Sequence, residues 1–247
     1  MRATEMSLKR WLLLAMTIVC PVAYAQGVVT AAEPDTAVRE SGFVRIGGID
    51  QYITIRGASA SNPVLLLIHG GPGDAQSVFE DEYAPYERDF ILVQWDQRGS
   101  GRTYGRYGDA TPSLTLDRHF LAVNQPLRER MGAADSEWLA TIRERVEKVA
   151  TAQELRMLGD GMSFSGRTLF PTQTTEDLFV TASEFVIPFI VIQGEHDLFT
   201  PTPIAEEYFD HVRAPRKHLR IIDGAGHFAL VTHQREFIAA LKAALEG

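Results

Sequence analysis

Short runs of consecutive apolar residues recur along this chain and are separated by stretches with helical spacing. Continuous apolar runs of this length are typical of strands that are buried on both faces of a parallel sheet. Two earlier runs flank Gly47 and Gly48, and this arrangement predicts a hairpin over 43–55. The predicted buried strands are 64–69, 90–95, 188–193 and 219–223.

Helical patterns separate several of these predicted strands. Residues 204–212 form one such pattern, and Phe237, Leu241 and Leu245 mark one face of a final helix. Because strands that alternate with helices build open sheets with helices on their faces, we expect an α/β fold with a mainly parallel sheet and flanking helices.

The middle of the chain, residues 103–187, contains no convincing buried strand. Apolar residues recur at helical spacing from Trp138 to Val149, which predicts a helix that starts near Asp135 or Ser136. We therefore expect a helical, cap-like segment over about 112–183.

The first 25 residues have the pattern of a secretory signal peptide. Basic residues precede a short apolar stretch, and Ala23-Tyr24-Ala25 provides a small-x-small cleavage pattern. The apolar stretch is short for a membrane span, although an uncleaved anchor is the alternative.

We expect an exported protein, periplasmic or secreted, whose mature part is a single domain of residues 26–247 without membrane attachment. The only cysteine, Cys20, would be lost with the signal.

The charge balance argues against one class of function. The chain has 24 basic and 32 acidic residues and a formal net charge of −8. Because nucleic-acid affinity depends mainly on neutralising phosphates, we expect no nucleic-acid partner.

A cluster of glycines follows the predicted strand 64–69, in the sequence LLIHGGPG. Sites in α/β sheets lie beyond the carboxyl ends of the strands. Glycines there let backbone N–H groups approach a ligand without a Cβ in the way, and such amides can stabilise the oxyanion of a tetrahedral intermediate. Gly70 and Gly71 are the candidate oxyanion loop, and a tight turn chosen only for its shape is the alternative.

The sequence DQRGSGR, residues 96–102, follows the next predicted strand. For Asp96 and Arg98 we favour a structural role in a salt-bridged loop. Neither glycine loop has the GxGxxG or GxxxxGK spacing of a phosphate-binding loop, so a phosphate cradle is not expected.

Two later loops each follow a predicted strand and carry an acid and a histidine. GEHD ends at Asp197 and GAGH ends at His227. This is the chain order of the Asp and His members of a hydrolase triad. Asp197 would hold one imidazole nitrogen of His227, so that the other can accept a proton from a nucleophile. His196, beside Asp197, is a weaker candidate.

In this order, HGGPG, DQRGSGR, GEHDLFTP and GAGHFA resemble the prolyl aminopeptidase (proline iminopeptidase) family of α/β-hydrolases. The resemblance covers roughly 42–111 and 184–246. It implies a serine hydrolase with a helical cap, which releases an N-terminal, proline-like residue from a small peptide and needs no metal or organic cofactor. In this resemblance Asp197 matches the triad acid, His227 the triad base, and Gly70 and Gly71 the oxyanion loop.

The triad serine, expected in a GxSxG strand-to-helix turn, is not found. The nearest match is GMSFS, residues 161–165, which follows a helical pattern, so Ser163 is a weak nucleophile candidate. The stretch between Arg102 and Asp197 is also shorter than in the family. We predict an α/β-hydrolase-type sheet with a reduced helical cap and without the nucleophile strand, and we expect an exposed sheet edge at 64–69 or 90–95.

Three interpretations follow from this sequence. The first is a serine hydrolase of the prolyl aminopeptidase type that lacks a recognisable nucleophile and is inactive for that reason. The second is a non-catalytic remnant, or a module that binds a peptide or another small molecule. The third is an esterase or amidase of the same fold, since one fold hosts many reactions.

Overall fold

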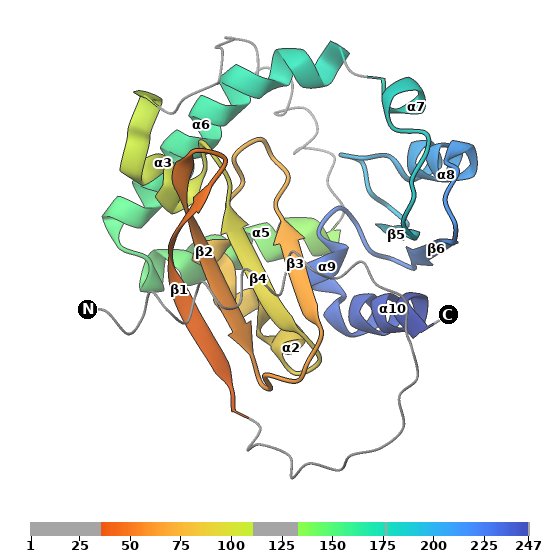
Figure 1. Ribbon diagram of the computed structural model, residues 1–247, viewed down its shortest axis with the longest axis horizontal. Helices are drawn as coiled ribbons and strands as arrows, with labels where there is room; N and C mark the ends of the chain where they lie inside the picture. The colour runs from red at the N-terminus through yellow and green to blue at the C-terminus, as the bar shows by residue number, and fades with distance from the viewer. Residues whose placement is uncertain (1–35, 111–132, 176, 247) are drawn as a thin grey trace. The chain divides into compact units, whose positions relative to one another are not determined.

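The computed structural model of this protein describes residues 36–110, 133–175 and 177–246, and the predicted signal peptide lies outside them. The strands, labelled in Figure 1, are β1 (Val38–Ile46), β2 (Ile49–Gly57), β3 (Val64–Ile68), β4 (Ile91–Asp96), β5 (Phe189–Gly194) and β6 (Lys217–Ile222). The earlier helices are η1 (Ser77–Tyr83), α2 (Ala84–Glu87), α3 (Gly101–Tyr107) and η2 (Gly108–Ala110). The later helices are α5 (Ala133–Val149), α6 (Ala152–Thr175), α7 (Leu178–Thr181), α8 (Thr202–His211), α9 (Ala229–Thr232) and α10 (Gln234–Glu246).

The predicted strands and hairpin are confirmed. The four apolar runs correspond to β3, β4, β5 and β6, and the hairpin corresponds to β1 and β2. Gly47 and Gly48 form its turn with φ values of 56° and 88°. Glycine adopts this left-handed region without steric cost, which explains the glycine pair at this position.

Within the described residues, the strands form one mixed sheet and one separate pair. The larger sheet has the order β1-β2-β4-β3, in which β1 and β4 each pair antiparallel with β2, and β3 and β4 are parallel. The register places Leu66 opposite Val93. β5 and β6 are parallel, with Val191 opposite Leu219. β3 therefore lies at one edge of the larger sheet.

β3 differs from the prediction of a strand buried on both faces. Leu65 and Leu67 point to one face and pack against the main core cluster. Val64, Leu66 and Ile68 point to the other face and are 51%, 48% and 59% exposed. The expected exposed edge is thus confirmed at this strand. Burial on both faces is wrong because, in the described part of the chain, the face that carries Val64, Leu66 and Ile68 is left partly uncovered.

The main core lies on the face of the larger sheet to which Leu65 and Leu67 point. Its buried cluster consists of Tyr83, Tyr86, Phe90, Leu92 and Ile238. The Tyr86 hydroxyl donates to the Leu230 carbonyl at 2.6 Å, which joins α2 to α9. Burying each apolar side chain of this size contributes about 1.5–3 kcal/mol. The cluster therefore holds α9 and α10 against β3 and β4.

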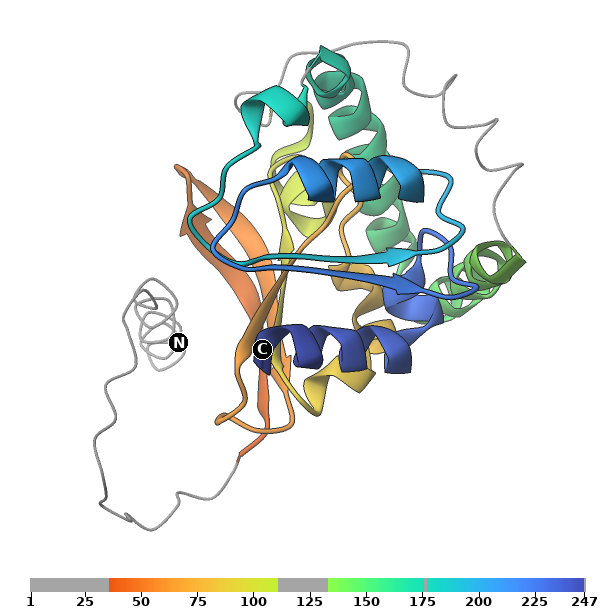
Figure 2. The ribbon, with the colours of Figure 1, turned by 90° about the vertical axis from the view of Figure 1, so that its right-hand side faces the viewer.

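Helix α10 also packs on the β5–β6 pair. Figure 2 shows α8 on one side of these strands and α10 on the other. Phe237 of α10 packs against both the main cluster and a second cluster that contains Ile222, Ala225 and Ala229. α10 consequently links the two groups of strands through its apolar face.

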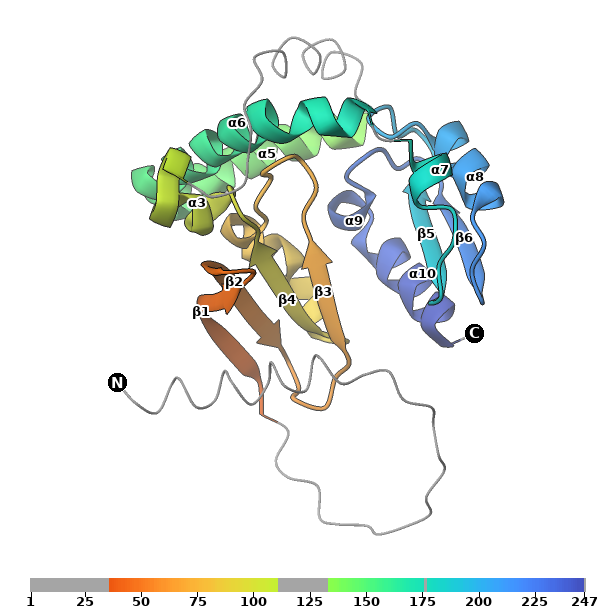
Figure 3. The same cartoon turned by 45° about the horizontal axis from the view of Figure 1, so that its top comes forward.

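The helices α5 and α6 lie across the carboxyl ends of β3 and β4 (Figure 3). The helix predicted from Trp138 onward is confirmed as α5, in which Ile142 and Val146 are buried. α6 packs closely on α3, because Gly105 leaves the space that Met157 occupies. Residues 111–132, at the start of the expected cap-like segment, lie outside the described ranges. Among the helices that the structure describes, none has the length and apolarity needed to cross a membrane.

Candidate active site

The glycine loop after β3, residues 69–73, is held in place by the loop after β4. The Gln97 N–H donates to His69 Nε2 at 3.2 Å, and the Gln97 side-chain amide donates to the His69 carbonyl at 3.0 Å. Because Nε2 is the acceptor nitrogen, Nδ1 carries the proton and donates to the Gly70 carbonyl at 2.9 Å. In the described ranges, the N–H groups of Gly70 and Gly71 donate to no protein acceptor. Both amides can therefore donate hydrogen bonds to an anionic oxygen.

Helix α6 lies directly against this glycine loop. A cavity of about 150 Å³ beside the loop is lined by His69, Gly70, Pro72, Gly73, Gln97, Arg98, Ser100, Ser165 and Leu169. The buried Ser165 hydroxyl donates to the Gly99 carbonyl at 2.7 Å. A Cβ on Gly73 would lie 2.8 Å from both Ser165 Cβ and the Gly161 carbonyl oxygen. Glycine at this position therefore permits the close packing of α6.

The structure brings Asp197 and His227 together. They follow the parallel strands β5 and β6, so their loops lie at the same edge of the strand pair. His227 Nδ1 is 2.9 Å from Asp197 Oδ2. The carboxylate side chain is 4% exposed, whereas the imidazole is 33% exposed. Glycine lets the two loops approach, since a Cβ on Gly194 would lie 2.1 Å from the Gly226 carbonyl oxygen.

Several donors surround the Asp197 carboxylate. The Phe199 and Thr200 N–H groups donate to Oδ1 at 2.8 and 2.9 Å. The Thr200 hydroxyl and the Gln193 amide donate to Oδ2 at 2.7 and 2.9 Å. Burial raises the pKa of Asp197, but the hydrogen bonds from His227 and Thr200 together lower it by more. The pKa of Asp197 therefore lies below its usual value. The ionised carboxylate accepts the Nδ1 proton of His227, which leaves Nε2 as the basic nitrogen.

Aromatic rings flank the imidazole of His227. The ring centroids of Phe199 and Phe228 are 4.8 and 5.1 Å from the imidazole centroid. Nε2 makes no hydrogen bond to any hydroxyl group in the described residues. The weaker candidate His196 is 62% exposed at its side chain and lies 3.5 Å from Glu195. The dyad geometry therefore belongs to His227.

No described serine completes a triad with Asp197 and His227. Ser163 is half-buried on α6, and no hydrogen bond joins it to His227. Its neighbour Ser165 bonds to the Gly99 carbonyl instead. Ser113 lies outside the described residues.

The loop 96–102 ties several elements together. The fully buried Asp96 carboxylate accepts bonds from the Ser77 hydroxyl at 2.8 Å and the Arg102 N–H at 2.9 Å. Burial raises the pKa of Asp96 against the opposing effect of these bonds. The Arg98 guanidinium donates to the Gly47 carbonyl at 2.8 Å in the hairpin turn. These contacts are typical of a structural loop. Asp96 bonds to Ser77 and Arg102, and Arg98 bonds to Gly47.

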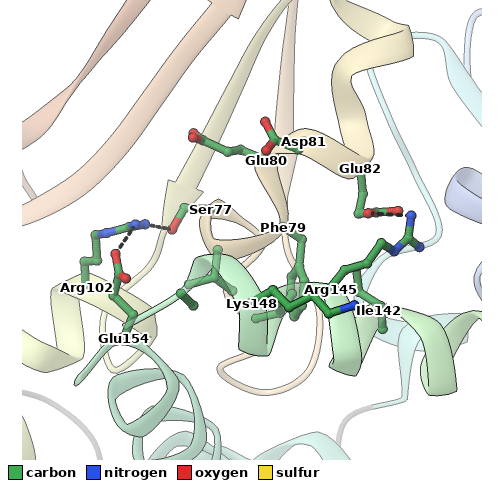
Figure 4. Close-up of a pocket in the computed structure, with 13 residues that line it drawn as sticks. Ser77, Phe79, Glu80, Asp81, Glu82, Arg102, Ile142, Arg145, Lys148 and Glu154 are labelled. Carbon is green, nitrogen blue, oxygen red and sulfur yellow. Dashed lines mark hydrogen bonds and ion pairs between the residues drawn. The ribbon is translucent and has the colours of Figure 1, made fainter. Parts of the chain in front are cut away.

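A larger cavity of about 380 Å³ lies between η1 and the helices α5 and α6 (Figure 4). Its lining combines apolar side chains such as Phe79 with ion pairs at Arg102–Glu154 (2.7 Å) and Arg145–Glu82 (3.0 Å). Neither the glycine loop nor the Asp197–His227 pair lines it. The larger cavity is therefore separate from the two loops that carry the candidate chemistry.

The sequence interpretation missed the role of Asp135, which it considered only as a helix start. Asp135 is 2% exposed, and its carboxylate accepts the N–H groups of His227 and Phe228 at 2.7 and 3.1 Å. Acidic residues are common at helix N-termini as local caps. The sequence around such a residue looks the same whether it caps its own helix or, as here, contacts a residue 92 positions away.

Solved structures with a similar fold are hydrolases of several kinds. A proline iminopeptidase-related protein from Thermus thermophilus is 20% identical, with a TM-score of 0.52 over 85% of this chain and 98% of that chain. A 2-hydroxy-6-oxo-6-phenylhexa-2,4-dienoate hydrolase from Rhodococcus sp. strain RHA1 is 15% identical, with a TM-score of 0.54 over 86% and 100% of the two chains. This chain has an α/β-hydrolase fold. In such folds the acid of a triad precedes the histidine along the chain, and Asp197 and His227 stand in that order after β5 and β6.

One sequence relative is the probable aminopeptidase YbaC of Bacillus subtilis (strain 168). It is 34% identical over 95 residues, which correspond to 38% of this chain and 27% of that protein. The match thus spans about a quarter of the relative's length. No model of a known protein family matches the chain.

Proposed function

We propose that this chain is a hydrolase of the prolyl aminopeptidase type that keeps the base and the oxyanion loop of an acyl-transfer site but lacks a recognisable nucleophile, and is therefore inactive. One observation carries the proposal. His227 is paired through Nδ1 with the buried Asp197, and its Nε2 meets no hydroxyl in the described residues.

The pair has the geometry of a general base. In a complete site, His227 Nε2 would take the proton of a serine hydroxyl as that oxygen attacks a carbonyl carbon. The N–H groups of Gly70 and Gly71 would stabilise the negative oxygen of the intermediate. Without the serine, the base has no side-chain hydroxyl to activate. Loss of a triad nucleophile lowers the rate by several powers of ten.

The sheet supports the absence of a nucleophile strand. In an α/β-hydrolase, the nucleophile sits on a strand-to-helix turn at the top of the sheet. In the described residues, β3 has no neighbour on its outer side, and one of its faces is half exposed. Ser165 lies near the glycine loop, but it sits within helix α6 and its hydroxyl bonds to a backbone carbonyl. It therefore does not replace an elbow serine.

The peptide substrate rests on similarity. The four sequence motifs, the 34% identity to a probable aminopeptidase and the fold likeness to a proline iminopeptidase-related protein all favour a small peptide with a free N-terminus. An esterase or amidase ancestry is the alternative within the same fold. The signal-like residues 1–25 favour a site of action outside the cytoplasm.

A second candidate function is a binding module for a peptide or another small molecule. Cavities that bind small molecules usually measure about 300–1,000 Å³. The cavity between η1 and α5, of about 380 Å³, falls in this range, whereas the one beside the glycine loop, of about 150 Å³, falls below it. A binding role would therefore use the larger cavity.

Labelling with a fluorophosphonate probe tests the proposed function, because this reagent reacts with activated serines. The full chain and a His227→Ala variant would be incubated with the probe, digested and mapped by mass spectrometry. An intact serine hydrolase would serve as the positive control. We expect no labelled peptide from either form of this chain.

Two outcomes would overturn the proposal. A label on Ser163 that disappears in His227→Ala would assign the nucleophile to α6. A base-dependent label within 111–132, for example on Ser113, would place it in that segment. Binding of a small peptide by an unlabelled chain, measured by calorimetry, would favour the binding module.

A further inference from the structure

A carboxylate from helix α5 holds the backbone of the His227 loop. Asp135, in the first turn of α5, is 2% exposed. Its Oδ2 accepts the N–H of His227 at 2.7 Å, and its Oδ1 accepts the N–H of Phe228 at 3.1 Å. Hydrogen bonds to a charged acceptor are stronger than neutral ones, and two of them fix orientation as well as distance. The two hydrogen bonds from Asp135 therefore fix the backbone of His227.

The shape of the loop matches this carboxylate. A Cβ on Gly226 would lie 2.0 Å from Asp135 Oδ2, so a larger residue at 226 would displace the carboxylate. On its other side, the Gly226 carbonyl lies close to Gly194, which leads into the Asp197 loop. Gly226 is thus enclosed between the α5 carboxylate and the loop of the catalytic acid.

A second contact joins α5 to the same loop. Trp138 lies three positions after Asp135, on the same helix face. Its ring is 4.6 Å from that of Phe228, measured between centroids. A carboxylate that only capped its own helix would accept N–H groups of that helix. The hydrogen bonds of Asp135 instead go to residues 92 and 93 positions away.

We propose that Asp135 is a positioning residue for His227. Asp197 holds the imidazole through Nδ1, and Asp135 holds the backbone of the same residue. Two fixed points set the direction of Nε2, which neither contact sets alone. The orientation of the base thereby depends on where α5 lies. This inference rests on the proposed function in one respect, that His227 is the base of the site.

Nuclear magnetic resonance of the full, ¹⁵N-labelled chain tests the positioning role. Two signals would be followed: the hydrogen–deuterium exchange of the His227 and Phe228 amides, and the Nδ1–H signal of His227 at low field. In Asp135→Asn, one amide N–H would face a side-chain NH₂ in place of an acceptor. We expect exchange of the two amides to accelerate by roughly tenfold to a hundredfold, together with loss of the Nδ1–H signal.

Glu137→Gln is the matched control, because it removes a carboxylate from an exposed position two residues along the same helix. We expect both signals to stay at wild-type values in this variant. Unfolding curves would be recorded for each variant. If Asp135→Asn does not fold, the wild-type exchange rates decide: protected His227 and Phe228 amides support the inference, and rates of an open loop refute it.

The outcomes separate this inference from the proposed function. An Nδ1–H signal that is present in the wild type, lost in Asp197→Asn and unchanged in Asp135→Asn would refute the positioning role alone. A wild-type chain without that signal would refute the Asp197–His227 pair itself. Loss of the signal in Asp135→Asn but not in Glu137→Gln, with cooperative unfolding in both, supports the positioning role.

Discussion

Two strand-tip loops of this protein differ in what surrounds them. The loop after β6 carries His227, and Asp197 and Asp135 hold that residue from two sides. The glycine loop after β3 has open amides, but helix α6 packs against it through Ser165 and Gly161. In the first loop, the described residues provide partners for the N–H and the Nδ1 of His227. The second loop is packed against a helix whose nearest serine, Ser165, bonds to a backbone carbonyl.

Under the proposed function, this difference separates the parts of the site that need only β5 and β6 from the part that needs a further strand. The Asp197–His227 pair depends on two neighbouring strands, β5 and β6, and both are present. An oxyanion loop can act only on an intermediate formed beside it, and that requires a nucleophile on a further strand. The geometry of the Asp197–His227 pair is therefore independent of whether a nucleophile lies beside the glycine loop.

The largest effect is expected at the point where α6 meets the glycine loop. Gly73 has a φ of 78°, and a Cβ there would lie 2.8 Å from the backbone of α6. Gly73→Ala should lower the free energy of unfolding by about 2–4 kcal/mol, through the left-handed backbone and the overpacking together. Urea unfolding would measure this loss.

Gly70→Ala is the control for that variant. A Cβ on Gly70 would meet nothing within 4 Å, so the free energy of unfolding should change by less than about 0.5 kcal/mol. Equal losses in the two variants would show that α6 does not pack on the loop at Gly73.

The next largest effect on stability is expected at Asp197, which pairs with His227. Asp197→Asn should lower the free energy of unfolding by about 1–3 kcal/mol at neutral pH, because a buried charged acceptor is lost. The pKa of Asp197 is lowered in the folded state, so its contribution is present above the unfolded pKa, near 3.9, and is lost as pH falls through the folded pKa. The difference between wild type and variant should therefore shrink below about pH 4.

Unfolding curves from pH 2 to pH 8 would measure this dependence. Asp210→Asn, at an exposed position near the end of α8, is the control. A wild-type advantage over Asp197→Asn that stays constant down to pH 2 would contradict the ionised Asp197–His227 pair.

The smallest effect on stability, with a visible effect on association, is expected at β3. Leu66 is 48% exposed on an apolar edge strand, a feature that favours intermolecular pairing. Leu66→Lys should change the free energy of unfolding by less than about 1 kcal/mol and reduce light scattering at high protein concentration. Leu67→Lys, in which the charge would enter the core, should unfold the protein. Unchanged scattering in Leu66→Lys would show that this edge does not drive association.

The sequence was sufficient to predict the features that depend on residues close together along the chain. Apolar runs located the strands, and helical spacing located α5 and α10. The order of acid and histidine on consecutive late strands was enough to pair Asp197 with His227, because parallel neighbours end at the same edge.

The remaining features depend on distant partners. Burial of β3 on both faces was wrong, because burial of a face depends on the elements that pack on it and not on the apolar run itself. Asp135 was missed because one acidic residue near a helix start has the same appearance whether it caps that helix or holds another loop. The packing of Ser165 on Gly73 depends on a contact between segments that carry no shared pattern.

Hydrolysis of a prolyl arylamide by the wild type and by His227→Ala tests the central claim most directly. The two proteins would be purified in parallel, and the released arylamine would be followed at matched concentrations. With the base present and no recognisable nucleophile for it to activate, both rates should equal the buffer background within about twofold. A wild-type rate that falls by about a thousandfold or more in His227→Ala would contradict the account, because it would show that His227 activates a nucleophile in this chain.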